Sequence, residues 1–196
     1  MRHILIAVLV LLALATSAFA QTSDDLDAFI ARHMASSGAP GLAYAFVDGE
    51  SLVSDASGVM RSGENAPVTP HTLFRIGSVT KSFTALAIVQ LAEAGQLTLD
   101  DEVASHLPVF ETQAPITLRQ LLSHTSGYST VQGNAAASGL TLSERGAQLA
   151  HDGPAQAPGT GWAYSNANYQ MLGAVIEAVS GQTYPDYVES NILRPA

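Results

Sequence analysis

The possible folds of this chain are limited most by one β-hairpin near its start. Residues 41–47 and 51–60 are typical of strands, and Asp48-Gly49 between them is typical of a tight turn. A two-stranded hairpin is marginal in water and leaves strand edges unpaired. Nothing between residue 61 and Ala196 is typical of a further strand. We therefore expect strands beyond Ala196 to complete the sheet, so that this chain is the N-terminal portion of a larger domain.

The rest of the chain is predicted to be largely helical, because apolar residues recur at helical spacing and Gly or Pro residues punctuate the segments. The expected helices span residues 23–37, 79–94, 100–107, 116–122, 142–150, 169–179 and 184–192. The helix at 79–94 is apolar on more than one face, which is typical of a central, buried helix. The predicted fold class is α+β, with a helical region packed on an antiparallel sheet and no linker between domains.

The first twenty residues have the pattern of a secretory signal peptide. Arg2 gives a basic start, residues 4–14 are apolar, and Ala18-Phe19-Ala20 fits a cleavage site before Gln21. The alternative is an uncleaved membrane anchor, although the apolar stretch is short for a spanning helix. We expect residues 21–196 to form a periplasmic or secreted protein with no stable membrane anchor. The chain has no Cys and therefore forms no disulfide.

The charge balance argues against some classes of partner. The formal net charge is −9, and without Arg2 the remaining seven basic and seventeen acidic side chains give −10. An acidic chain of this kind is not expected to bind nucleic acid or anionic lipid. A small-molecule or peptide substrate remains open.

Ser78 and Lys81 form the first candidate catalytic pair. Ser78 lies where the apolar helix begins, so its backbone N–H is free to donate to an oxyanion. Lys81 is the only Lys of the chain and shares a helix face with Ser78. A Lys desolvated by burial is a plausible general base for a Ser hydroxyl. The structural alternative is that Ser78 serves only as a helix N-cap.

Tyr164 and Asn166 form the second candidate group. They follow the turn-rich residues 158–161 and precede an amphipathic helix. A Tyr hydroxyl beside an ammonium group has a lowered pKa and can relay a proton. Asn166 can both donate and accept hydrogen bonds to a substrate amide. The structural alternative is that Tyr164 packs at the helix entrance while Asn166 caps the helix.

Other chemistries have little support. His124 could suggest a Ser/His pair, but the chain has no Gly-x-Ser-x-Gly sequence, and we interpret His124 as a structural turn residue. The six His residues form no His-x-x-x-His pair and no Cys is present, so we expect no metal site. No cofactor is expected either, because Gly159-Thr160-Gly161 lacks the later Gly of a dinucleotide-binding loop.

Taken together, these motifs resemble those of the class C β-lactamase and D-alanyl-D-alanine carboxypeptidase family. Residues 74–84 (FRIGSVTKSFT) are similar to its first motif, and Tyr164-Ser165-Asn166 is similar to its Tyr-x-Asn second motif. Residues 116–127 (ITLRQLLSHTSG) and Pro158-Gly159 resemble two further blocks. The resemblance covers essentially all of residues 21–196 and implies a β-lactamase/transpeptidase-like fold.

The resemblance also implies a mechanism. Ser78 would attack a carbonyl and become acylated, Lys81 and Tyr164 would share the acid and base steps, and Asn166 would orient the substrate amide. The Ser78 backbone N–H would contribute to the oxyanion hole. Tyr-Ser-Asn in place of the Ser-Asp-Asn of class A enzymes favours the class C side of the superfamily.

One departure from the family pattern is serious. The family has a third motif, a Lys- or His-led triplet ending in Gly, on a late strand that also carries a second oxyanion donor. Nothing after Asn166 supplies that triplet. The loss of one oxyanion donor costs roughly 3 kcal/mol of transition-state stabilisation. This departure independently suggests truncation at Ala196, and we expect the chain as written to be inactive or nearly so.

Three functional hypotheses follow. The first is an acyl-serine hydrolase acting on a D-alanyl peptide, a β-lactam, a small ester or a D-amino amide. The second is a non-catalytic relative that binds peptidoglycan fragments or a partner protein, and the third is an inactive gene fragment. Covalent labelling of the Ser distinguishes the first hypothesis from the second.

Overall fold

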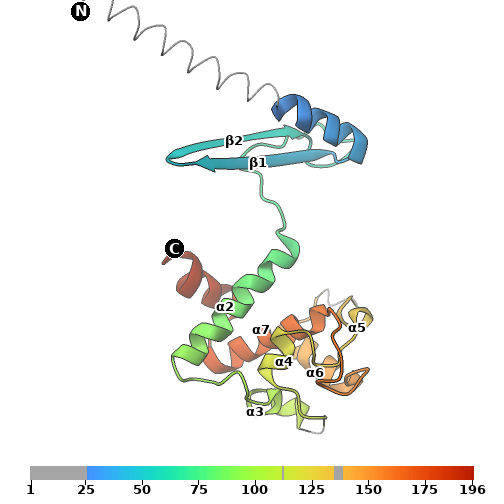
Figure 1. Cartoon of the computed structure of the whole chain (residues 1–196), viewed down its shortest axis with the longest axis vertical. Coiled ribbons are helices and arrows are strands. Elements are labelled where there is room, and N and C mark those ends of the chain that lie inside the picture. The colour runs from blue at the N-terminus through green and yellow to red at the C-terminus, as the bar shows by residue number, and fades with distance from the viewer. Residues whose placement is uncertain (1–25, 112, 135–138) are drawn as a thin grey trace, which may run out of the picture. The chain divides into compact units, whose positions relative to one another are not determined.

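The described residues of the N-terminal unit form one helix and the hairpin (Figure 1). The computed structural model describes residues 26–111, 113–134 and 139–196, and the chain divides into two compact units at Arg75 and Ile76. The predicted signal peptide at 1–20 and the first three residues of the expected helix at 23–37 lie outside the described residues. Residues 26–37 are helical, and Gly38 follows with a φ of +70° as the helix ends.

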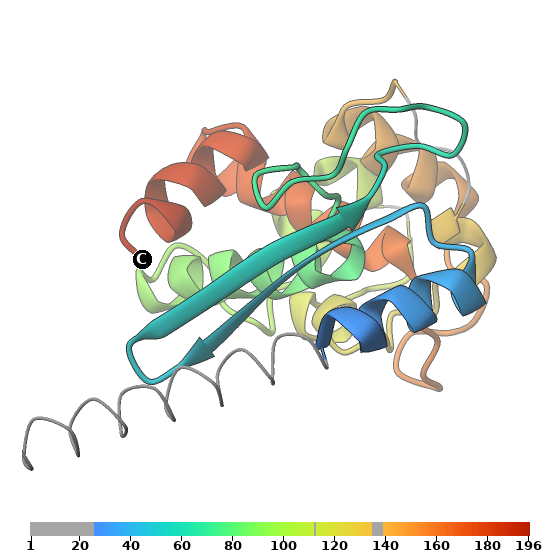
Figure 2. The same cartoon turned by 90° about the horizontal axis from the view of Figure 1, so that it is seen from above.

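The hairpin consists of the antiparallel strands β1 (Gly41–Asp48) and β2 (Ser51–Gly58), which run side by side along their whole length (Figure 2). Gly41 pairs with Gly58 and Asp48 with Ser51. The two turn residues are therefore 49 and 50, one position later than the expected Asp48-Gly49. Gly49 has a φ of +60°, which a residue without a Cβ adopts at little cost, as the first position of a hairpin turn requires.

The second and third residue pairs from the turn are apolar and exposed. Val47 and Leu52 are opposite each other in the register and are 76% and 68% exposed. The neighbouring pair, Phe46 and Val53, is also exposed. β1 and β2 are the only strands in the described part of the chain. The expected further strands therefore stay a prediction.

The second unit, from Ile76 onward, is helical. A short 3₁₀ turn, η1 (Gly77–Val79), leads into α2 (Thr80–Glu93). The remaining elements are α3 (Val103–His106), η2 (Pro108–Phe110), α4 (Leu118–Leu122), α5 (Thr130–Asn134), α6 (Leu142–Asp152), α7 (Asn166–Ser180), α8 (Tyr184–Val188) and the π-helical turn η3 (Glu189–Leu193).

The most buried helix of the second unit is α7, while the expected central position of the 79–94 helix stays a prediction. Eight residues of α7 are buried, against four of α2. Helices α2, α4, α5, α6 and α8 all pack against α7. Leu86 and Val89 of α2 are 44% and 38% exposed, so only one of its two apolar faces is covered within this unit. The apolar pattern of a helix indicates that a face must be buried, but it does not indicate which element covers that face.

Helix α7 also begins three residues earlier than expected. Ser165 is its N-cap and its side chain accepts a hydrogen bond from the Ala167 N–H. This cap makes Asn166 the first helical residue. The short helix α5 was not predicted, because its five residues carry no apolar periodicity.

Candidate active site

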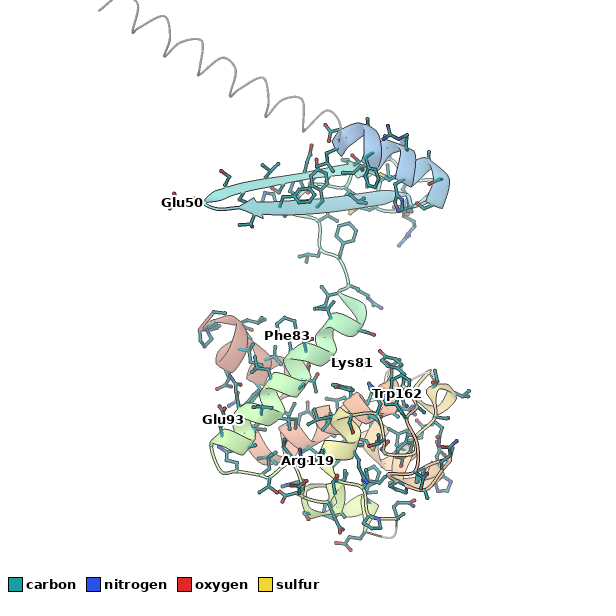
Figure 3. The ribbon with its side chains drawn as sticks, viewed as in Figure 1. Glu50, Lys81, Phe83, Glu93, Arg119 and Trp162 are labelled. Atoms are coloured by element: carbon teal, nitrogen blue, oxygen red, sulfur yellow. The ribbon has the colours of Figure 1, made fainter. Side chains whose placement is uncertain are left out.

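The second unit brings the four predicted site residues together. Ser78 lies in the 3₁₀ turn before α2, and Lys81 lies one turn further along, in the first turn of α2. Figure 3 shows Lys81 on the side of α2 that faces the segment bearing Trp162. The Lys81 Nζ is 3.4 Å from the Ser78 Oγ. The predicted sharing of one helix face is therefore present, and Lys81 is half-buried.

Tyr164 and Asn166 reach the same pair of side chains from the other end of the sequence. The Tyr164 hydroxyl is 2.7 Å from the Ser78 Oγ. Lys81 donates to the Asn166 Oδ1 at 2.6 Å, and its Nζ is 4.9 Å from the centre of the Tyr164 ring. Ser78 therefore contacts both groups that could move its proton, while Asn166 holds the ammonium group in place.

The electrostatics favour Tyr164 as a proton acceptor. The hydrogen bond from the Lys81 ammonium and, next, that from the Ser78 hydroxyl lower the pKa of Tyr164, because both stabilise the phenolate. Partial burial acts in the opposite direction and is outweighed. A phenol with a lowered pKa, 2.7 Å from a Ser hydroxyl, has the geometry of a general base.

The backbone N–H of Ser78 meets the requirement for an oxyanion donor. It lies at the start of a 3₁₀ turn that runs into α2, where the first N–H groups have no partner within the helix. No acceptor for it occurs among the described residues. Ser78 itself is exposed, so a substrate carbonyl can approach.

The segment that carries Tyr164 is fixed by α5 and the turn before it. Thr130 donates from its hydroxyl to the Tyr164 carbonyl at 2.6 Å, and Ser165 donates from its hydroxyl to the Ser129 carbonyl at 2.8 Å. Gly133 lies so close that a Cβ there would be 2.4 Å from the Asn166 backbone nitrogen. The two helix ends therefore meet with no room for a side chain.

His124 lies directly behind Tyr164. Its φ of +60° is the one positive value at a non-glycine position in the described residues, which agrees with its interpretation as a turn residue. Its ring centre is 4.7 Å from that of Tyr164 and 5.3 Å from that of Tyr169. Burial and, next, the charge of Lys81 lower the pKa of His124. The sequence analysis did not predict the contact between His124 and Tyr164. The only signal that could have suggested it is the spacing between residues 116–127 and Ser78.

A pocket of about 330 Å³ opens beside Lys81. Its walls come from η1, α2, α6, α7 and α8, and they include Thr84, Asn166, Gln170 and Tyr184. The Thr84 and Tyr184 hydroxyls are 2.7 Å apart in one of these walls.

No group of three or more His, Cys, Asp or Glu side chains in the described part of the chain could hold a metal ion. No helix in that part of the chain is long and apolar enough to cross a membrane.

Comparison with known proteins supplies a family. The family model described as Beta-lactamase matches residues 26–196. The chain is 33% identical over 168 residues to the putative penicillin-binding protein PbpX of Bacillus subtilis, a match that covers 85% of this chain and 42% of that protein. The chain spans less than half the length of the curated relatives that it matches.

Solved structures give the same result. The octameric penicillin-binding protein homologue from Pyrococcus abyssi superposes with a TM-score of 0.75 at 33% identity, covering 88% of this chain and 42% of the other. A D-stereospecific amidohydrolase from Streptomyces sp. gives a TM-score of 0.60 at 35% identity, over 80% of this chain and 49% of the other. The predicted β-lactamase/transpeptidase-like fold class is confirmed by these comparisons.

Proposed function

Because this chain belongs to the β-lactamase family, which has serine hydrolases among its members, we propose that it is a serine hydrolase that cleaves an amide or ester through an acyl-enzyme. The observation that carries the proposal is the convergence of Tyr164 and Lys81 on the Ser78 Oγ, at 2.7 and 3.4 Å. A helix N-cap needs neither contact, so the purely structural interpretation of Ser78 leaves both unexplained.

In the acylation step the Ser78 Oγ attacks the substrate carbonyl carbon and its proton passes to the Tyr164 oxygen. The lowered pKa of Tyr164 favours the phenolate that accepts this proton. The negative charge that develops on the carbonyl oxygen is stabilised by the Ser78 N–H. Tyr164 then returns the proton to the leaving nitrogen or oxygen as the bond to the carbonyl carbon breaks.

Deacylation reverses these roles. Tyr164 takes a proton from a water molecule, the water oxygen attacks the acyl carbon, and the proton returns to Ser78 as the ester bond breaks. The Lys81 Nζ lies 4.9 Å from the centre of the Tyr164 ring and is itself held by Asn166 at 2.6 Å, so Lys81 is placed to share the acid and base steps. We assign Asn166 a second role in orienting the substrate amide.

The finer features are also proposals. Tyr-Ser-Asn at 164–166 favours the class C side of the family, and the substrates to compare are D-alanyl peptides, β-lactams, small esters and D-amino amides. The amidohydrolase and penicillin-binding names of the relatives support this choice. We propose a periplasmic or secreted location after cleavage before Gln21, and a second oxyanion donor supplied by sequence outside residues 21–196.

Covalent labelling tests the proposal. A fluorophosphonate or β-lactam probe is added to the protein as its gene encodes it, and mass spectrometry locates the adduct. We expect one adduct at Ser78, no adduct in Ser78→Ala, and normal labelling in Ser82→Ala, a matched control at an exposed Ser in the first turn of α2. A folded wild-type protein that gains no mass with either probe would contradict the catalytic proposal and favour a binding role.

A further inference from the structure

The geometry points to His124 as the positioning residue that holds Tyr164 against Ser78 through the neutral, Nε2-protonated form of its ring. This inference deepens the proposed function and rests on it for one of its two readouts. It explains why the only described non-glycine residue with a positive φ is a His that contacts the ring of the proposed base.

His124 accepts hydrogen bonds from the backbone N–H groups of the residues before and after Tyr164. Its carbonyl oxygen accepts a hydrogen bond from the Ala163 N–H at 3.0 Å, and its ring Nδ1 accepts one from the Ser165 N–H at 3.2 Å. Tyr164 lies between these two anchored nitrogens. A single residue therefore fixes the backbone before and after the proposed base.

The hydrogen bonds also determine the ring's protonation state. A backbone N–H can only donate, so the Nδ1 that faces the Ser165 N–H must carry a lone pair. The amide of Asn168 agrees, because its oxygen accepts from Ser126 and its nitrogen is 3.0 Å from the same Nδ1. The neutral ring then carries its proton on Nε2.

Conformational strain at His124 fits a specific role. A positive φ is a strained conformation for an L-residue, although His tolerates this region better than most residues. The strained conformation places the carbonyl and the ring of His124 on the same segment, Ala163 to Ser165. If residue 124 were extended and the rest of the turn stayed as it is, its carbonyl oxygen and its ring could not both reach this segment.

The charges around the ring oppose its protonation. The titratable groups that face it are Lys81 of α2, the proposed base Tyr164 and Tyr169 of α7. No carboxylate contributes to the shift in its pKa, which burial and then Lys81 lower. A proton on Nδ1 would remove the acceptor of the Ser165 N–H and add a second cation beside Lys81. At acid pH the protonated His124 therefore no longer holds the Ser165 N–H, and Tyr164 is released from its position against Ser78.

The first test is independent of activity. In ¹⁵N NMR spectra of the full chain, the His124 signal is identified by its absence from His124→Asn. We expect a non-protonated Nδ1, a protonated Nε2, and proton uptake only below the ordinary His pKa of about 6.5. A protonated Nδ1, or titration at the ordinary pKa, would overturn the inference even if the protein proves to be no enzyme.

The second test compares two substitutions by their rate of Ser78 labelling. The Asn Oδ1 can replace Nδ1 as an acceptor and Asn tolerates a positive φ, whereas Leu does neither. We expect His124→Leu to label about 100-fold more slowly, as for a displacement of about 1 Å, and His124→Asn to recover most of that loss. The loss of rate in acid that accompanies His124 protonation should be absent from His124→Asn.

Circular dichroism and thermal melting confirm that both variants are folded before labelling is compared. If both folded variants lose the same amount of labelling rate, the inference is overturned, because an acceptor for the Ser165 N–H would then make no difference to the rate. Wild-type rates in both would overturn it as well. If the wild-type protein is not labelled at any pH, the proposed function fails while the NMR result still decides the state of His124.

Discussion

Replacing Gly133 with Ala tests whether the close meeting of α5 and α7 shapes the site. A Cβ at this position would lie 2.4 Å from the Asn166 nitrogen, 2.7 Å from the Ser165 Oγ and 3.0 Å from the Ala167 nitrogen. Two of these atoms belong to the backbone of α7 and cannot rotate away. Because ordinary contacts begin near 3.4 Å, the two helix ends must separate by roughly 1 Å.

The expected magnitude follows from two opposing effects. Overpacking of this kind costs about 1–3 kcal/mol of unfolding free energy. The exchange of Gly for Ala within a helix contributes up to about 1 kcal/mol in the opposite direction. Gly146 of α6 provides the matched control, because it is also helical and buried but a Cβ there would meet nothing within 4 Å. We expect Gly146→Ala to be neutral or slightly stabilising and Gly133→Ala to be about 1–4 kcal/mol less stable than the control.

The catalytic effect should be larger than the loss of stability suggests. Displacement of Ser165 and Asn166 by about 1 Å moves Tyr164 and releases Lys81, and such shifts can cost about 100-fold in rate. Urea denaturation measures the first effect, and the rate of Ser78 labelling below the unfolding transition measures the second. If Gly133→Ala matches Gly146→Ala in both measurements, the contact between α5 and α7 does not shape the site and this reasoning is wrong.

Three further predictions concern other features of the chain. The rate of Ser78 labelling should rise with pH as Tyr164 loses its proton, at a pH below the ordinary Tyr pKa. Lys81→Met should move that rise to higher pH, because it removes the cation that stabilises the phenolate. A pH–rate profile of both proteins tests this prediction. Arg145 is 1% exposed and donates hydrogen bonds to oxygens of three Gln residues. Replacing it with Met should lower the free energy of unfolding by more than about 2 kcal/mol, because those acceptors lose their donor. Equal midpoints of urea denaturation would contradict this prediction. Purified residues 21–196 should turn over ester and amide substrates poorly, since they contain no third motif, and robust turnover would show that no further oxyanion donor is needed.

Local features of the structure were predictable from the residues. Interactions within a few positions of the chain determine the hairpin, the Ser78–Lys81 pair and most helices. The strands of the hairpin and the helix that carries Lys81 were predicted within one or two residues of their observed bounds. The helix at 169–179 was predicted to begin three residues too late, because its start depends on a cap by Ser165 that follows a loop.

Contacts between distant segments were not predictable in the same way. The sequence showed that two faces of the 79–94 segment are apolar, but it could not show that α7 covers one of them and becomes the most buried helix. The approach of Gly133 to the start of α7 is likewise invisible in a five-residue helix with no apolar periodicity. His124 was interpreted correctly as a turn residue, while its contact with Tyr164 depends on a fold that joins residues forty positions apart.

The sequence by itself therefore determined which side chains are chemically capable and which of them share one helix turn. Ser78 and Lys81 meet because helix geometry places residues three positions apart on one face. Only the tertiary structure decided that Tyr164, 86 positions away, lies 2.7 Å from the Ser78 hydroxyl and that Asn166 holds Lys81. The physical reason is that the packing of α2 against α7 buries the apolar core of the second unit, and this packing brings the two motifs together.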